Sequence, residues 1–201
     1  MTDITKLLQH ITTNDNIINK IYLLDDYVID SKKNLVQNNI FPYCGYPSEN
    51  IINSTTFAEN YVSNYIECNK DDINHEDHEK VKEKITDKLQ KEIDSNILII
   101  CITYPLSNPA YYQFELKKNM VQSDLLYLYT IGYQLTYYIE ESDDEDPGHI
   151  PGMFNRASSN GRFGIWGHDI EDLVYNGNSK LILFSTNDNT KCVYFEADCD
   201  S

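Results

Sequence analysis

The sequence is poor in basic residues, and this shortage limits its partners. It has 16 Lys and Arg against 32 Asp and Glu, which gives a formal net charge of −16 at pH 7. A charge of this sign repels nucleic-acid phosphates and anionic membrane surfaces. Direct binding to nucleic acid or to a membrane is therefore disfavoured.

Long apolar runs and paired cysteines are also missing. No segment reaches the roughly 18 consecutive apolar residues of a membrane span, and the start, MTDITKLLQHITTNDN, lacks the apolar core of a signal peptide. The five cysteines form no CxxC pair, and Cys101 lies within an apolar run. An odd count of this kind indicates reduced thiols. We therefore expect a soluble protein in the cytoplasm.

Glycine-rich phosphate loops are absent as well. Neither GxxxxGK[ST] nor GxGxxG occurs, and the glycine-containing stretch from Pro147 to Tyr175 has no lysine. Nucleotide binding is unsupported, and no cofactor is predicted.

Apolar spacing predicts helices in the first part of the chain. Asp3 can cap a short helix that ends near Thr12, and Asp15 can cap a second one whose apolar residues reach Val28 at spacings of four, three and four. A capping box of Thr56 and Glu59 predicts a third helix to about Cys68. Asn74 is a candidate cap for a fourth, which a narrow apolar stripe from Val81 to Ile93 predicts.

From Asn96 onward the pattern changes to strands around one helix. NILIICITY and YYQFELK predict a hairpin, and a helix of about 18 residues follows from Ser123. Gly132 on its apolar face indicates close packing on a sheet. The segments LVY, KLILFST and KCVYFEA predict further strands. We therefore predict an α+β fold, with a mainly antiparallel sheet packed on one long central helix and an N-terminal helical region. The predicted domains are 1–95 and 96–201.

The end of this long helix runs into an acidic segment. Six of the seven residues from Glu140 to Asp146 are acidic. Such a run repels itself and is typical of a solvated, mobile loop. A calcium loop is the alternative, but the segment lacks the order of oxygens and the closing glutamate that calcium requires.

The stretch from Pro147 to Tyr175 combines turns, polar groups and the single tryptophan. Gly164 and Gly167 flank Ile165 and Trp166, which holds the indole in one orientation close to a neighbouring backbone. A fixed surface of this kind is typical of protein contacts. The predicted binding residues are Asn155, Arg156, Arg162 and Trp166.

The same stretch contains the residue types of a hydrolase. His168 with Asp169 or Asp172 forms a candidate catalytic set, with Ser158 or Ser159 as nucleophile. No GxSxG turn supports this interpretation. In the alternative, His168 and Asp169 cap and tie down a turn.

Metal binding is the weakest of the alternatives. His149 and His168 with Asp172, or His75 with His78, have suitable ligand types. The pair His75 and His78 lacks a fixed third partner, and the set with His149 is weaker still, so no metal is predicted.

One segment resembles a known group of proteins. GMFNRASSNGRFGIWGHDIEDLVY, which follows a Tyr-rich helix and an acidic loop, resembles the C-terminal part of an uncharacterised protein family of mimivirus-type giant viruses. The resemblance covers about 97–197 and is most specific in GIWGHDIEDL. It implies a viral or virus-related protein in the cytoplasm of an infected host, and it implies no substrate.

Three functions remain open on the sequence. The first is a non-enzymatic protein-binding or scaffolding module, which the aromatic excess and the acidity favour. The second is a hydrolase that uses His168. The third is a mimic of nucleic acid, which requires carboxylates spaced along one face. The oligomeric state is not predicted.

Overall fold

A mixed, mostly antiparallel sheet forms the centre of the computed structural model. The structure describes residues 1–12, 17–29, 35–38, 53–71, 77–143 and 158–200. Its seven strands lie in the order β1-β2-β6-β5-β9-β8-β3, and only β5 and β9 pair in parallel. The strands are β1 (Thr2–Asp3), β2 (Ile18–Leu24), β3 (Leu35–Asn38), β5 (Ile97–Ile102), β6 (Ala110–Leu116), β8 (Val174–Ser185) and β9 (Lys191–Asp200).

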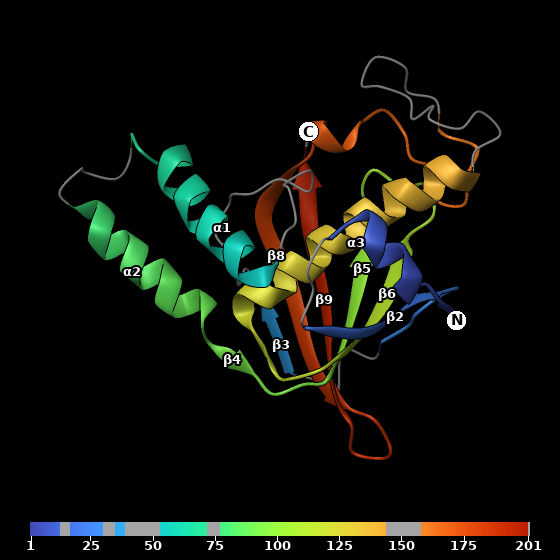
Figure 1. Cartoon of the computed structure of the whole chain (residues 1–201), viewed down its shortest axis with the longest axis horizontal. Helices are drawn as coiled ribbons and strands as arrows, with labels where there is room; N and C mark the ends of the chain where they lie inside the picture. The colour runs from blue at the N-terminus through green and yellow to red at the C-terminus, as the bar shows by residue number, and fades with distance from the viewer. Residues whose placement is uncertain (13–16, 30–34, 39–52, 72–76, 144–157, 201) are drawn as a thin grey trace.

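The longest α-helix lies across one face of the sheet, and the other two lie together beside its first turns (Figure 1). The longest, α3 (Gln122–Asp143), crosses this face, whereas α1 (Ser54–Cys68) and α2 (His78–Leu89) form a pair near the N-terminal end of α3. Asn53 caps α1 by accepting a hydrogen bond from the Thr56 amide at 3.0 Å. No helix within the described residues is long and apolar enough to cross a membrane.

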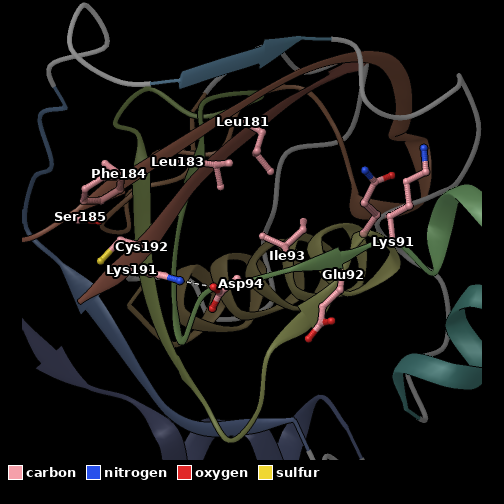
Figure 2. Close-up of a pocket in the computed structure, with 11 residues that line it drawn as sticks. Lys91, Glu92, Ile93, Asp94, Leu181, Leu183, Phe184, Ser185, Lys191 and Cys192 are labelled. Carbon is pink, nitrogen blue, oxygen red and sulfur yellow. Dashed lines mark hydrogen bonds and ion pairs between the residues drawn. The ribbon is translucent and has the colours of Figure 1, made fainter. Parts of the chain in front are cut away.

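A short two-stranded ribbon links the helices to the sheet. It consists of β4 (Glu92–Ile93) and β7 (Met120–Val121), which pair antiparallel. Across from β4 lies β8, and residues of both strands line a pocket (Figure 2).

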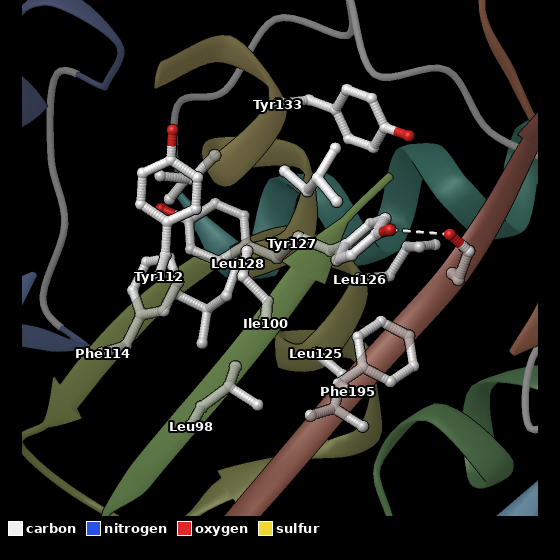
Figure 3. Close-up of a cluster of buried hydrophobic side chains, with 14 of the residues drawn as sticks. Leu98, Ile100, Tyr112, Phe114, Leu125, Leu126, Tyr127, Leu128, Tyr133 and Phe195 are labelled. Carbon is white, nitrogen blue, oxygen red and sulfur yellow. Dashed lines mark hydrogen bonds between the residues drawn. The ribbon is translucent and has the colours of Figure 1, made fainter. Parts of the chain in front are cut away.

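The side chains of α3 form the centre of the core (Figure 3). Leu125, Tyr127 and Leu128 are fully buried together with Ile100 of β5 and Phe195 of β9. Burial of such apolar side chains is the main driving force for this packing.

Two residues of α3 determine how closely it approaches the sheet. The buried Tyr129 hydroxyl donates to the carbonyl oxygens of Cys101 and Ala197, at 3.0 and 2.6 Å, and so bridges β5 and β9. A Cβ atom at Gly132 would lie 2.4 Å from Ile100 Cδ1, so glycine permits the close packing that the sequence predicted.

The N-terminal region differs from the prediction. The helix expected between Asp15 and Val28 is wrong, because Ile18–Leu24 forms β2 and pairs with β6. The helix expected from Asp3 to Thr12 is a 3-10 helix, η1 (Thr5–His10), which follows β1. Since β1, β2 and β3 join β5, β6, β8 and β9 in one sheet, residues 1–95 supply strands to the domain predicted for 96–201.

The start of the acidic segment also differs from the prediction. The expectation of a solvated loop from Glu140 is wrong there, because α3 continues to Asp143 and Glu140 is fully buried. Residues 144–146 lie outside the described residues.

Candidate functional site

The candidate site residues that the structure describes lie near the C-terminal end of α3. The chain enters this region at Ser158, forms isolated bridges from Ser158 to Trp166 and from Leu106 to Ile165, and continues into the 3-10 helix η4 (Ile170–Asp172). Arg162, Trp166, His168, Asp169 and Asp172 therefore share one region. Asn155, Arg156 and His149 lie outside the described residues.

The carboxylate of Glu140 holds this segment in place. Glu140 has no exposed surface. Its Oε2 accepts a hydrogen bond from the Phe163 amide at 2.7 Å, and its Oε1 accepts from the Gly164 amide at 2.7 Å and the Ile165 amide at 3.4 Å. The Ser159 hydroxyl also donates to Oε1. Several donors of this kind satisfy a buried carboxylate and fix the path of the backbone around it.

A glycine makes this close approach possible. A Cβ atom at Gly161 would lie 2.6 Å from Glu140 Cδ and within 2.9 Å of both carboxylate oxygens. Real side chains do not tolerate such a distance, so position 161 requires glycine as long as Glu140 keeps its place.

Three rings meet where the segment faces the loop after β5. Tyr104 Oη lies 2.9 Å from His168 Nε2. The rings of Tyr104 and Trp166 are nearly perpendicular, with centroids 5.5 Å apart. Such an edge-to-face contact is favourable beyond the area that it buries. Both rings are partly exposed, whereas His168 is buried.

Hydrogen bonds from α3 fix the backbone on both sides of this cluster. The Tyr137 hydroxyl donates to the His168 carbonyl, and the Tyr133 hydroxyl donates to the Tyr104 carbonyl, each at 2.8 Å. The buried helix therefore positions the rings through their main chains.

The two aspartates stabilise the turn that follows. Asp169 and Asp172 form a reciprocal capping box at η4, in which the Asp172 side chain accepts from the Asp169 amide at 3.2 Å. This capping role is the one that the sequence analysis gave to Asp169 as the alternative to catalysis. Loss of solvent, together with the charges of Asp172 and Glu171, raises the pKa of Asp169.

The serine hydroxyls do not form a nucleophile–base pair with His168 in the described residues. Ser159 donates to Glu140, and Ser158 Oγ lies 3.2 Å from Ser107 Oγ. A serine nucleophile requires a hydrogen bond to its general base. The geometry therefore gives the hydrolase interpretation no support.

The described thiols are poor nucleophiles. Cys101, Cys192 and Cys199 are free and buried. Burial raises the pKa of each, and that of Cys199 to about 12. Thiols of this kind stay protonated at neutral pH and react slowly. Within the described ranges, no three His, Cys, Asp or Glu side chains form a group that could hold a metal ion.

Arg162, like Asp169, is exposed. It pairs with Asp25 at 3.2 Å, and its guanidinium lies 5.8 Å from the centroid of the Phe163 ring. An exposed pair of this kind contributes little to stability.

Comparisons with protein-family models, with curated proteins and with solved structures find no match. The site is therefore defined by its own geometry. Sequence reasoning missed Glu140, Tyr104 and Tyr137. The one available signal was Glu140 itself, because it continues the helical repeat of α3 although it is the first residue of the acidic run.

Proposed function

We propose that the protein is a non-enzymatic protein-binding module that presents a preformed contact surface around Trp166. This Trp166 surface consists of Tyr104, Trp166, Asp169 and Glu171. The observation that carries the proposal is the set of hydrogen bonds that Glu140 accepts from the Ser159 hydroxyl and from the backbone amides of 163–165, which immobilises the segment in the unbound protein.

Preorganisation favours binding because the segment loses little conformational freedom on contact with a partner. Tyr and Trp side chains are the commonest anchors of protein interfaces, since each offers a large area with few rotatable bonds. Tyr104 and Trp166 are both partly exposed and are held against each other, as such anchors need to be.

The charge of the surface favours a basic partner. Asp169 and Glu171 are exposed beside Asp172, and their mutual repulsion contributes to the raised pKa of Asp169. A Lys or Arg of a partner would relieve this repulsion. The net charge of −16 would also steer a basic protein toward this one.

We also propose that this contact takes place in the cytoplasm, in an infected host if the resemblance to giant-virus proteins reflects common descent. The free thiols of Cys101, Cys192 and Cys199 suit a reducing compartment.

The test is affinity capture from host lysate with wild-type protein, Trp166→Ala and the control Lys84→Ala, which changes an exposed residue of α2. Each partner is quantified by mass spectrometry, and the fold of each variant is checked by circular dichroism. We expect Trp166→Ala to lower recovery of the partner by about tenfold or more, because loss of an interface anchor costs about 2 kcal/mol.

Salt provides the second measurement. Recovery by the wild type is expected to fall as salt rises from about 0.05 to 0.5 M, since screening shortens the range of charge attraction. Equal recovery by wild type and Trp166→Ala would contradict the proposal.

A further inference from the structure

One serine interrupts the acidic run at the end of α3. Ser142 is the only uncharged residue between Glu140 and Asp146, and it is the last residue but one of the helix. Its side chain is exposed, and its hydroxyl donates to the Tyr138 carbonyl of the preceding turn at 2.9 Å. Since this bond lies within one helix, an enzyme can approach the hydroxyl from the solvent.

The sequence on both sides of Ser142 suits an enzyme with a basic substrate cleft. Two glutamates precede the serine, and the four residues 143–146 that follow it are all acidic. Lys and Arg side chains lining such a cleft would pair with these carboxylates and would select this serine by charge.

Ser63 of α1 provides the contrast to Ser142. It is also exposed, and its hydroxyl also donates to the carbonyl four residues earlier, that of Glu59, at 3.0 Å. No acidic residue lies within three positions of Ser63 on either side. The two serines therefore share their local geometry, and only Ser142 has the flanking charges.

The last turn of α3 connects Ser142 to the Trp166 surface. Glu140 lies two residues before Ser142 in this turn. Its buried carboxylate accepts the hydrogen bonds from the Ser159 hydroxyl and from the amides of 163–165. If the last turn unwinds, the backbone of Glu140 moves and these bonds weaken. A change at Ser142 can therefore reach the Trp166 surface through Glu140.

A phosphate at position 142 would oppose the helix. Phosphoserine carries about −1.5 to −2 charges at pH 7, and the C-terminal end of a helix already has the negative end of the helix dipole. Glu140 and the exposed Glu141 add charges of the same sign. Phosphorylation also removes the O–H group that donates to Tyr138. Each of these effects destabilises the last turn.

We propose that Ser142 is a phosphorylation site for an acidophilic serine kinase, and that its phosphate loosens the hold of Glu140 on the Trp166 surface. In the reaction the Ser142 hydroxyl oxygen forms a bond to the γ-phosphorus of ATP. The bond from this phosphorus to the β–γ bridging oxygen breaks, ADP leaves with that oxygen, and the hydroxyl proton passes to the kinase base. The effect on partner binding rests on the proposed function, whereas the phosphorylation does not.

The first experiment locates the phosphate. The full chain is incubated with Mg-ATP and a purified acidophilic kinase of the casein kinase type, and the modified residue is identified by fragmentation mass spectrometry. We expect Ser142→Ala to lower the rate of phosphate incorporation by about tenfold or more, because it removes the acceptor that the flanking charges select. Ser63→Ala, the matched control, should leave the rate unchanged. Absence of incorporation in the wild type, or an equal rate in Ser142→Ala, would overturn the proposal.

The second experiment compares the phosphorylated and unphosphorylated chains by amide hydrogen exchange. The amides of 163–165 are expected to exchange about threefold faster or more after phosphorylation, as the last turn of α3 loosens. Those of Ile99 and Ile100 in β5 should not change, and treatment with a phosphatase should restore the original rates. Unchanged exchange at 163–165 in the fully phosphorylated chain would refute the link to Glu140. Neither experiment needs a partner, so its failure is distinct from equal partner recovery by wild type and Trp166→Ala.

Discussion

Glu140 shows how strongly one side chain can determine the structure of a distant segment. Its carboxylate accepts hydrogen bonds from three backbone amides and one hydroxyl between residues 159 and 165. The neighbouring Glu141 is exposed. Two consecutive glutamates therefore have different roles, because the helix turns one toward the core and the other toward water.

The first prediction concerns this residue. Glu140→Gln replaces one accepting oxygen by an NH₂ group, which leaves at least one buried N–H without an acceptor. We expect the free energy of unfolding to fall by about 2–4 kcal/mol, measured by urea denaturation at pH 7. The emission of Trp166, the single tryptophan, should also shift toward the red as the segment loosens.

Glu141→Gln is the matched control for this change. It removes the same charge from an exposed position, so its effect should stay within about 0.5 kcal/mol. A loss of similar size in both variants would mean that net charge, and not the hydrogen bonds of Glu140, is responsible.

At the scale of elements, α3 holds the two halves of the sheet together. On one side of the β5–β9 pair lie β6, β2 and β1, and on the other lie β8 and β3. The Tyr129 hydroxyl bridges this pair by donating to one carbonyl on each side. The contact between helix and sheet is thus polar as well as apolar.

The second prediction concerns that bridge. Tyr129→Phe keeps the ring but leaves two buried carbonyl oxygens without this donor, so we expect a loss of about 1–3 kcal/mol in the free energy of unfolding. Tyr138→Phe is the control, because the Tyr138 ring stacks on His10 and its hydroxyl has no partner among the described residues. Urea denaturation compares the two, and equal losses would refute a specific role for Tyr129.

The sequence predicted elements well where local pattern and tertiary structure agree. The helices at 54–68 and 122–143 and the strands at 97–102 and 110–116 follow from periodicity and β-branched residues, but the cap of the first helix is Asn53 and not the predicted Thr56. The prediction failed at 15–28, because Ile17, Ile21 and Val28 also fit a helical repeat. A strand forms there because Ile18 and Ile21 complete the core beside β6. Tertiary packing overrides a local period in such cases.

The site was less accessible to sequence reasoning. The segment around Trp166 was predicted to form a fixed surface, and the capping role of Asp169 was among the alternatives. The contacts that fix it come from Glu140, Tyr104 and Tyr137, which are distant in the sequence. Spacing within one segment cannot reveal partners that only folding brings together.

At the scale of the molecule, the sheet joins the N-terminal and C-terminal parts of the chain. The third prediction is that a fragment of residues 96–201 does not fold alone, because it loses β2 and thus exposes the edge of β6 and the core around Phe114. We expect weak near-UV circular dichroism and no cooperative unfolding. Co-expression with residues 1–95 should restore both signals. A fragment that unfolds cooperatively by itself would establish 96–201 as an independent domain.

The parallel pairing of β5 and β9 also has a consequence for the kinetics of folding. This parallel pairing begins with Ile97 opposite Cys192. The Ser95 hydroxyl stabilises the beginning of the pairing by donating to the Lys191 carbonyl at 2.9 Å. The hairpins β5–β6 and β8–β9 connect near neighbours in the sequence, so each can form early. Pairing β5 with β9 requires the ends of a long loop to meet, and this step is slow because it costs conformational entropy. Docking of these two hairpins is therefore expected to set the folding rate of the whole chain.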